Sequence, residues 1–103
     1  MTEGDIVRLC EGSSLRWTSH ILERLFQRNI CVDDVKAALA NGEIIEQYPD
    51  DYPFPSCLVL GHTASGYPLH VVCGSNGTEL WLITAYFPAP AEWTEDFRRR
   101  RKA

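Results

Sequence analysis

The stretch PLHVVCGSNGTELWLITAYF, residues 68–87, decides the fold. Two apolar runs flank Asn76-Gly77, the dipeptide that most strongly favours a two-residue β-hairpin loop. With this dipeptide as the loop, the two strands are antiparallel and Leu69 lies opposite Thr84. Because side chains alternate between the faces of a sheet, one face is expected to carry Leu69, Val71, Cys73, Leu80, Leu82, Thr84 and Tyr86. The other face is expected to carry His70, Trp81 and Ile83.

Two helices are expected upstream of the hairpin, over residues 18–28 and 32–41, because their apolar residues recur at helical spacing. Strand-like runs follow at residues 43–47 and 56–61. Helices followed by a run of strands predict an α+β fold. We therefore expect two N-terminal helices packed on a four-stranded antiparallel sheet.

The two ends of the chain are less regular. Residues 2–11 are open between a weak helix and an extended arm, and residues 91–102, led by Pro90, are expected to form a short C-terminal helix. The length of 103 residues fits a single domain spanning 1–103. The sequence contains no repeat and no linker-like segment that would divide it further.

Charge is divided unevenly along the chain. The formal net charge is −4, yet Arg98–Lys102 are all basic, and the other five basic residues are outnumbered by all 14 acidic ones, so residues 1–97 carry −9. This balance disfavours a broadly basic nucleic-acid binder, whose affinity comes from many phosphate contacts, but it allows a local basic site. The basic tail, residues 98–103, is expected to be frayed and solvated or, alternatively, to contact phosphate groups or an acidic partner through Arg98 and Arg99.

The composition also bears on the class of protein. No apolar run reaches the roughly 18–20 residues that span a bilayer, and the first residues lack the layout of a signal peptide. A cytoplasmic protein with no membrane contact is therefore expected. The four cysteines lack the spacing of a zinc site, so they are expected to be buried apolar side chains, and no metal or cofactor is expected.

The helix over residues 18–28 carries the clearest chemical pattern. His20, Arg24 and Arg28 recur at i, i+4 and i+8, which places them in one stripe along the helix. An imidazole moves protons near neutral pH, and guanidinium groups bind phosphate and stabilise negative charge in a transition state. The stripe predicts a site for phosphate chemistry, with the alternative of a solvated helix face on which Glu23 pairs with the arginines.

A second set of candidates lies on the hairpin. Thr84 and Tyr86 are two residues apart, so both hydroxyls lie on one face of the strand and can order or position a phosphate group. The alternative is a packing pair whose tyrosine hydroxyl bonds locally. His70 sits in an apolar run and is either a structural histidine or a substrate-binding one.

Several of these residues belong to short segments in a fixed order. The segments are Ser19-His20, Glu23-Arg24, Arg28-Asn29-Ile30, Asp34-Val35, Asn41–Ile45, Tyr48-Pro49, Pro55-Ser56, Leu58–Gly61, Pro68–Val72, Ile83–Tyr86, Pro88, Trp93 and Phe97. Over roughly residues 15–101, the sequence resembles the bacterial domain-of-unknown-function family 4258, which is similar to the RelE-type and barnase-like ribonuclease toxins. The resemblance implies a RelE-like fold and RNA cleavage without a metal. It carries the catalytic roles onto His20, Arg24, Thr84 and Tyr86.

The leading expectation is thus a RelE-like ribonuclease toxin that acts on RNA and is held by an antitoxin protein. His20 is expected to serve as general base or acid, with Arg24 and Arg28 stabilising the phosphate, while Tyr86 and Thr84 position it. The rival is a non-catalytic protein-interaction module of the same fold, which the split of charge favours. The sequence leaves a monomer and a homodimer both open, the latter through a strand edge or the sheet face of Trp81 and Ile83.

Overall fold

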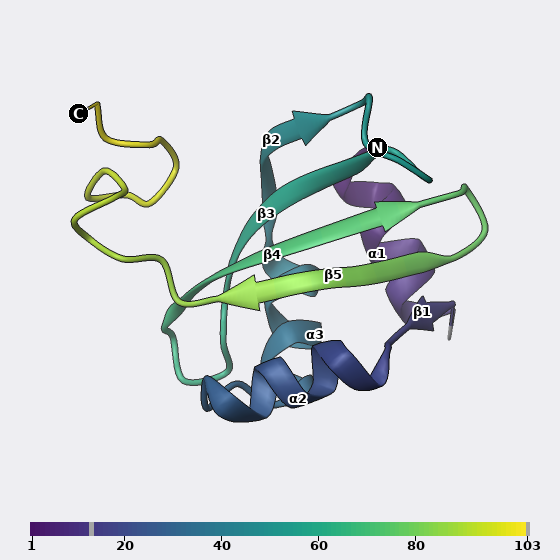
Figure 1. Cartoon of the computed structure of the whole chain (residues 1–103), viewed down its shortest axis with the longest axis horizontal. Coiled ribbons are helices and arrows are strands. Elements are labelled where there is room, and N and C mark those ends of the chain that lie inside the picture. Colours follow the sequence, from purple (N-terminus) through teal and green to yellow (C-terminus); the bar gives the residue numbers. More distant parts are fainter. Residues whose placement is uncertain (13, 103) are drawn as a thin grey trace.

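The computed structural model describes residues 1–12 and 14–102. Within them the order of elements is α1 (Glu3–Glu11), β1 (Leu15–Arg16), α2 (Ser19–Gln27), α3 (Val32–Asn41), β2 (Glu43–Tyr48), β3 (Ser56–His62), β4 (Pro68–Ser75) and β5 (Leu80–Tyr86) (Figure 1). The strands form one sheet in the order β1-β5-β4-β3-β2. The α+β class is confirmed, but the sheet is five-stranded and mixed.

At the N-terminal end the structure decides between the helix and the arm left open by the sequence, and it adds a short strand. Residues 3–11 form a helix, begun by a capping box in which the Thr2 hydroxyl accepts from the Asp5 backbone and the Asp5 carboxylate accepts from the Thr2 backbone. The two-residue strand β1 pairs in parallel with β5. A strand this short carries no periodicity, so the expectation of four antiparallel strands was wrong.

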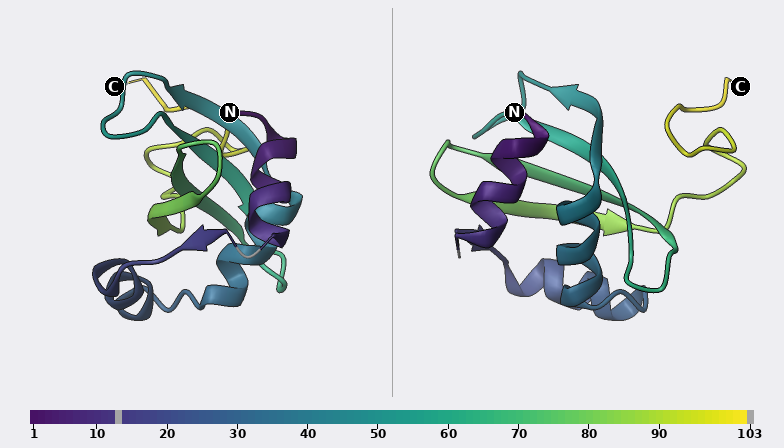
Figure 2. Two further views of the ribbon diagram at one scale, coloured as in Figure 1. Left: turned by 90° about the vertical axis from the view of Figure 1, so that its right-hand side faces the viewer. Right: turned by 180° about the vertical axis from the view of Figure 1, so that it is seen from behind.

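Helices α1 and α3 cover one face of the sheet, which we call the inner face (Figure 2). Helix α3 lies directly on β3, where a Cβ added at Gly61 would come within 2.0 Å of the Ala38 carbonyl oxygen. The core between these layers is apolar and includes Ile6, Leu9, Ile21, Leu25, Ile30, Val35, Ala38, Leu39, Cys57, Val59, Leu69, Val71, Cys73, Leu80, Leu82 and Ala85.

Helix α2 runs along β5, at the border of the sheet (Figures 1 and 2). Its N-cap is Thr18, one of the two caps expected from sequence, whose hydroxyl accepts a hydrogen bond from the Ile21 backbone. Asn29 follows the helix with φ of 58°, a left-handed conformation that asparagine tolerates. Ile21 and Leu25 enter the core, whereas Phe26 on another side of the helix is 85% exposed.

The hairpin between β4 and β5 has a different register from the one expected. Its loop spans residues 76–79, because the Asn76 side chain accepts hydrogen bonds from the backbone of Thr78 and Glu79 and so builds a longer turn. Ser75 then pairs with Leu80, and Thr84 pairs with Val72 instead of lying opposite Leu69. The strands still meet in antiparallel fashion, but the pairs are displaced along the chain.

A β-bulge at Ile83 moves the far half of β5 to the other face. Cys73 pairs with Leu82, whereas Val72 pairs with Thr84 and His70 with Tyr86. The expectation that Thr84 and Tyr86 share a face with Leu69 and Val71 was therefore wrong, and Ala85 takes the inner position instead. Thr84 and Tyr86 lie with His70 and Trp81 on the side of the sheet away from α1 and α3, which we call the outer face.

The expected C-terminal helix is absent from the described residues. Residues 88–101 run as turns, with one isolated bridge between Trp93 and Arg100. Thr94 and Asp96 hold these turns, since the Asp96 carboxylate accepts from the Thr94 hydroxyl and the Arg98 backbone. This C-terminal segment lies beyond the end of β5, on the left in Figure 1.

The cysteines differ among themselves. Cys57 and Cys73 are fully buried opposite each other on β3 and β4, with their sulfur atoms 3.8 Å apart. Cys10 is half-buried and Cys31 is exposed, so the expectation of four buried cysteines holds for two. No group of three metal-ligating side chains is found among the described residues. No helix within them is both long enough and apolar enough to cross a membrane.

Candidate functional site

The basic stripe of α2 consists of His20, Arg24 and Arg28, and its two ends have different surroundings. The side chains of His20 and Arg24 are exposed and form no hydrogen bond or ion pair with any other described residue. Glu23 also makes no ion pair with Arg24 or Arg28 among the described residues. No contact in the structure therefore supports the alternative of a helix face on which Glu23 pairs with the arginines. The imidazole and the guanidinium are both open to a ligand.

Arg28 connects the stripe to β5. Its Nη1 atom donates to the Thr84 hydroxyl at 3.1 Å and to the Ala85 carbonyl oxygen at 2.8 Å. The guanidinium is half-buried, and the two acceptors belong to the strand on which Thr84 and Tyr86 lie. The structure thereby joins Arg28 and Thr84, which are 56 residues apart in the sequence.

Tyr86 lies beside His70 on the outer face. The His70 ring is completely buried, and its Nε2 lies 2.9 Å from the Phe97 carbonyl oxygen. A carbonyl only accepts, so Nε2 carries the proton and Nδ1 accepts from the Tyr86 hydroxyl at 3.3 Å. Burial lowers the pKa of His70 and raises the pKa of Tyr86. His70 is thus a neutral histidine with both nitrogens engaged.

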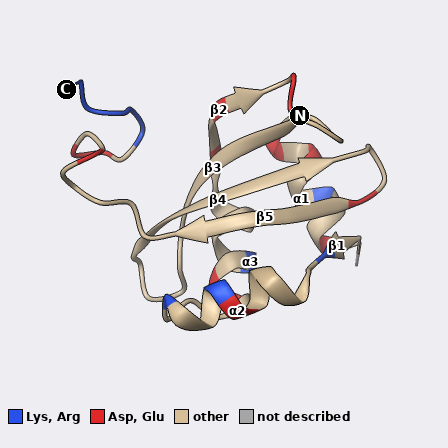
Figure 3. Ribbon diagram, viewed as in Figure 1, with Lys and Arg blue, Asp and Glu red and all other residues tan. Residues whose placement is uncertain are grey.

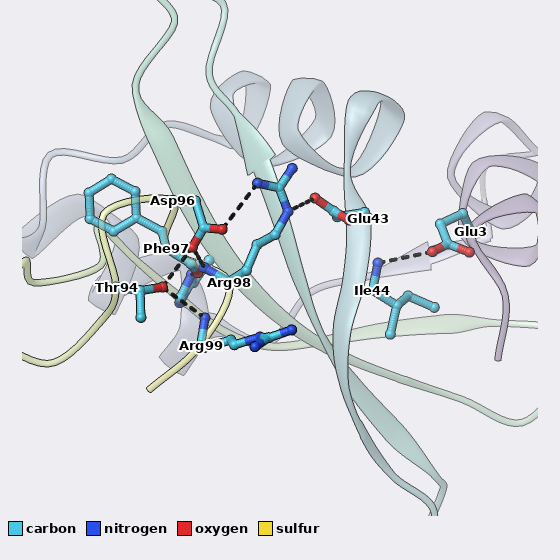
Figure 4. A network of polar contacts seen from close by, with 9 residues as sticks. Glu3, Glu43, Ile44, Thr94, Asp96, Phe97, Arg98 and Arg99 are labelled. Carbon is cyan, nitrogen blue, oxygen red and sulfur yellow. Dashed lines mark hydrogen bonds and ion pairs between the residues drawn. The ribbon is translucent and has the colours of Figure 1, made fainter. Parts of the chain in front are cut away.

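The basic tail is attached to the edge strand β2. Arg98 pairs with Glu43 and with Asp96, as Figure 4 shows. Arg100 donates to both carboxylate oxygens of Glu46 at 3.1 Å and stacks over the Trp93 ring. The frayed tail expected from sequence is therefore wrong for these residues, because the acids of β2 hold them.

Arg99 differs from its neighbours. Only its backbone is fixed, by donation to the Thr94 hydroxyl at 3.3 Å, while its side chain contacts no acid among the described residues (Figure 4). Of the two tail residues expected to contact a substrate, Arg99 is open and Arg98 is neutralised by Glu43. Figure 3 shows lysine and arginine chiefly on α2 and on the tail, and they are sparse in the rest of the chain.

Sequence reasoning passed over one part of the outer face. This part is the connection between β2 and β3, residues 49–55. In the structure it forms one wall of a groove with Trp81 and Ile83 of β5, and Tyr52 is 96% exposed there. Its aromatic residues among prolines were the available signal, but nothing in the sequence joined them to Trp81.

Comparison with known proteins agrees with the resemblance noted from the sequence. A family model described as a domain of unknown function (DUF4258) matches residues 17–87, which is most of the chain and includes α2 and all of β2–β5. No curated protein matches the sequence, and no solved structure matches the fold. The C-terminal segment lies outside the matched region.

Proposed function

The chain belongs to the family of the domain of unknown function DUF4258, and we propose that it is a metal-independent endoribonuclease of the RelE-like toxin type. The observation that carries this proposal is the bonding of Arg28 to Thr84 and Ala85. It connects α2, which carries the candidate imidazole and guanidinium groups, with the end of β5, which carries the two candidate hydroxyls.

The proposed reaction is attack of a ribose 2′-hydroxyl on the adjacent phosphate, which restricts cleavage to RNA. The 2′-oxygen bonds to phosphorus and passes its proton to a base, while the bond to the 5′-oxygen breaks and that oxygen takes up a proton. The products are a 2′,3′-cyclic phosphate and a free 5′-hydroxyl. The reaction therefore needs proton transfer and stabilisation of charge on the phosphate.

The stripe can supply both needs. The exposed His20 imidazole serves as general base or general acid, and Arg24, next to it on α2, stabilises the negative charge that grows on the phosphate. Arg28 remains tied to Thr84, so it contributes its charge from a fixed position. Thr84 orders Arg28 in turn and, through it, the phosphate.

Tyr86 is assigned to positioning the phosphate. Its hydroxyl is held by the neutral His70 ring, which gives His70 the role of a positioning residue rather than a direct substrate contact. Among the tail residues, Arg99 is free to contact a phosphate of the RNA, and Arg98 would first have to leave Glu43.

Single substitutions of His20 and Arg24 test the proposal. We expect His20→Ala and Arg24→Ala each to lower RNA cleavage by about 10²-fold or more, the usual contribution of a general acid–base group or an oxyanion donor. Arg8→Ala on α1 is the matched control and keeps full activity. The readouts are cleavage of RNA by purified protein and growth arrest on expression. Wild-type protein inert in both assays, or variants as active as wild type, would refute the proposal.

A second candidate function is a protein-interaction module, for example one that binds an antitoxin. It is favoured by two exposed apolar residues on one side of α2, Leu22 at 42% and Phe26 at 85% exposure. They border a shallow hollow with Ile30 and Val32. An apolar surface of this kind is typical of an interface.

A photo-crosslinking residue placed at position 26 tests this candidate in cells. We expect one protein to be cross-linked, and the same protein, once purified, to bind the wild-type chain but not Phe26→Ser. Failure of the purified protein to bind, or equal binding to Phe26→Ser, would exclude this surface.

A further inference from the structure

A groove lies at the end of the outer face that the C-terminal segment does not reach. Its walls come from β5, from the connection between β2 and β3, and from the residue before α2. The lining residues are Thr18, Asp51, Tyr52, Pro53, Phe54, Gly74, Trp81, Leu82 and Ile83. Figure 1 views the sheet from this side, with α2 alongside β5.

The surface of the groove is aromatic and open to solvent. Tyr52 is 96% exposed and Ile83 is 51% exposed, although both are large apolar side chains. Gly74 forms part of the floor, where a Cβ would lie 3.2 Å from the Pro55 carbonyl oxygen and 3.5 Å from Ile83. A larger residue at position 74 would therefore crowd this floor. A flat ring is the shape of ligand that such walls accommodate best.

One wall residue of the groove, Trp81, carries an unpaired hydrogen-bond donor that is buried beside it. The indole Nε1 of Trp81 is the one buried side-chain nitrogen or oxygen without a hydrogen-bond partner among the described residues. Buried polar groups in native proteins are almost always paired, so an unpaired donor calls for an explanation. An acceptor on a bound ring, such as a base carbonyl or ring nitrogen, would pair it once the exposed walls adjust.

The groove adjoins α2 and β5, the two elements that Arg28 joins. Thr18, at one side of the groove, is the N-cap of α2 and lies two residues before His20. Ile83, at the other side, directly precedes Thr84, to which Arg28 is bonded. A ring in the groove would therefore have cationic side chains next to it.

The charges in and around the groove are distributed to suit a neutral ring with a phosphate attached. The acid that lines it, Asp51, already accepts a hydrogen bond from the Ser56 hydroxyl. The cations lie outside, on α2, where His20 and Arg24 have no partner among the described residues. A neutral ring between the aromatic walls and an anion on the stripe is the complementary arrangement.

We propose that the groove binds a base of single-stranded RNA, stacked on Tyr52 with its edge toward Trp81, and delivers the neighbouring phosphate to His20 and Arg24. This inference rests on the proposed ribonuclease function and names the subsite that holds its substrate. Bases stack on aromatic side chains regardless of their identity, so only a modest sequence preference is expected. The pairing of Trp81 Nε1 favours bases that present an acceptor to it.

Binding is measured apart from cleavage with a fluorescein-labelled 2′-O-methyl RNA of twelve nucleotides and mixed sequence. The methyl group blocks the attacking hydroxyl, so the probe is not cut. We expect Tyr52→Ala to weaken binding about five-fold or more, the effect of losing one stacked base. Tyr67→Ala, which removes another exposed tyrosine outside the groove, is the control and binds like wild type. Since Tyr52 is almost fully exposed, its loss leaves the fold intact.

Salt dependence gives a second measurement. The stripe offers two or three phosphate contacts, so the logarithm of the binding constant should fall against the logarithm of salt concentration with a slope of about −1.4 to −2.1. A steeper slope, typical of many phosphate contacts, would place the probe on another surface and overturn the groove as the main subsite.

The outcomes separate the groove from the activity. If Tyr52→Ala cleaves and binds as well as wild type, the groove is excluded while the ribonuclease stands. If the probe binds with Tyr52 dependence but unmodified RNA is never cut, the groove stands and the ribonuclease is excluded. If the wild-type chain does not bind the probe at all, the groove inference fails, and a cross-link from position 52 to a protein would identify a protein partner instead.

Discussion

The two ends of the outer sheet face each carry aromatic residues with a polar group, but these residues differ in burial and in hydrogen bonding. At one end, His70 and Tyr86 lie beneath the C-terminal segment, and both nitrogens of His70 are bonded. At the other end, Tyr52 is open to solvent and Trp81 Nε1 has no partner among the described residues. We call them the closed end and the open end.

This difference in pairing and exposure indicates different roles for the two ends. At the closed end, buried polar groups are fully paired within the chain, which is how a protein fixes one conformation. His70 of β4 contacts both Phe97 and Trp93 and so fastens the C-terminal segment. At the open end an apolar surface and a donor remain available. The closed end therefore fixes the C-terminal segment and the position of Tyr86, and the open end offers an unpaired surface to a ligand.

The largest expected contrast comes from one aromatic residue at each end. Trp93→Ala removes a ring that is 2% exposed and packed edge-on against His70, and should lower the free energy of unfolding by about 3–5 kcal/mol. Tyr52→Ala removes a ring that is 96% exposed, and should change it by less than about 0.5 kcal/mol. Urea denaturation of both variants measures this contrast. Similar losses of unfolding free energy in the two variants would show that the two ends contribute equally to stability.

Substitution of His70 tests the polar contacts of the closed end. His70→Phe fills a similar space but leaves the Tyr86 hydroxyl and the Phe97 carbonyl without their partner, which should cost about 1–3 kcal/mol. Phe97 has φ of 60°, a conformation that a bulky residue rarely adopts, so we expect the segment to loosen there first. Hydrogen exchange should quicken in residues 93–101 before it does in β3. Uniform loss of protection would contradict a local fastening role.

The sequence predicts some elements of these two ends and not others. Helices α2 and α3 were predicted because apolar spacing and caps are local signals, and the basic stripe of α2 follows from the same spacing. The hairpin register was not predicted correctly. Asn76-Gly77 favours a two-residue loop, but in the structure the Asn76 side chain accepts from the Glu79 backbone and the loop is longer. The longer loop shifts the pairing by two residues and so leaves each side chain on its expected face, whereas the bulge at Ile83 alone moves Thr84 and Tyr86 to the outer face.

The remaining failures concern contacts between distant residues. The C-terminal helix was expected from a leading proline and a charged run, but Arg98 and Arg100 are drawn instead to Glu43 and Glu46 on β2. The bond between His70 and Phe97 and the bond between Arg28 and Thr84 likewise join segments far apart in the chain. Local spacing contains no information about such pairs, so the site could be predicted only as separate halves.

The pH dependence of stability provides a smaller effect at the closed end. Burial lowers the pKa of His70 in the folded chain, while the Phe97 carbonyl and Glu46 raise it and Arg100 lowers it. The unfolded chain therefore binds a proton more readily than the folded chain, and stability increases with pH across this range. The contribution is complete above the ordinary histidine pKa of about 6.5 and is lost as the pH falls through the lower, folded value.

Denaturation midpoints between pH 8 and pH 4.5 measure this loss. His70→Asn, which cannot titrate, should flatten the part of the profile that His70 causes. His62→Gln is the matched control, since this histidine lies at the exposed end of β3, and its profile should follow wild type. A profile of His70→Asn that falls as steeply as wild type would assign the acid sensitivity to another group.

The smallest expected effect lies at the open end, where one atom of Trp81 distinguishes a ligand-binding role from a structural contact. Replacing Trp81 with 3-benzothienylalanine exchanges the indole N–H for sulfur and keeps the shape of the ring. Because Nε1 has no partner among the described residues, the exchange should change the free energy of unfolding by less than about 0.5 kcal/mol, or raise it slightly. A loss of about 1 kcal/mol or more would mean that the N–H is paired in solution, and the contrast with His70 would disappear. If stability is unchanged while binding of the RNA probe weakens, the donor serves the ligand and not the fold.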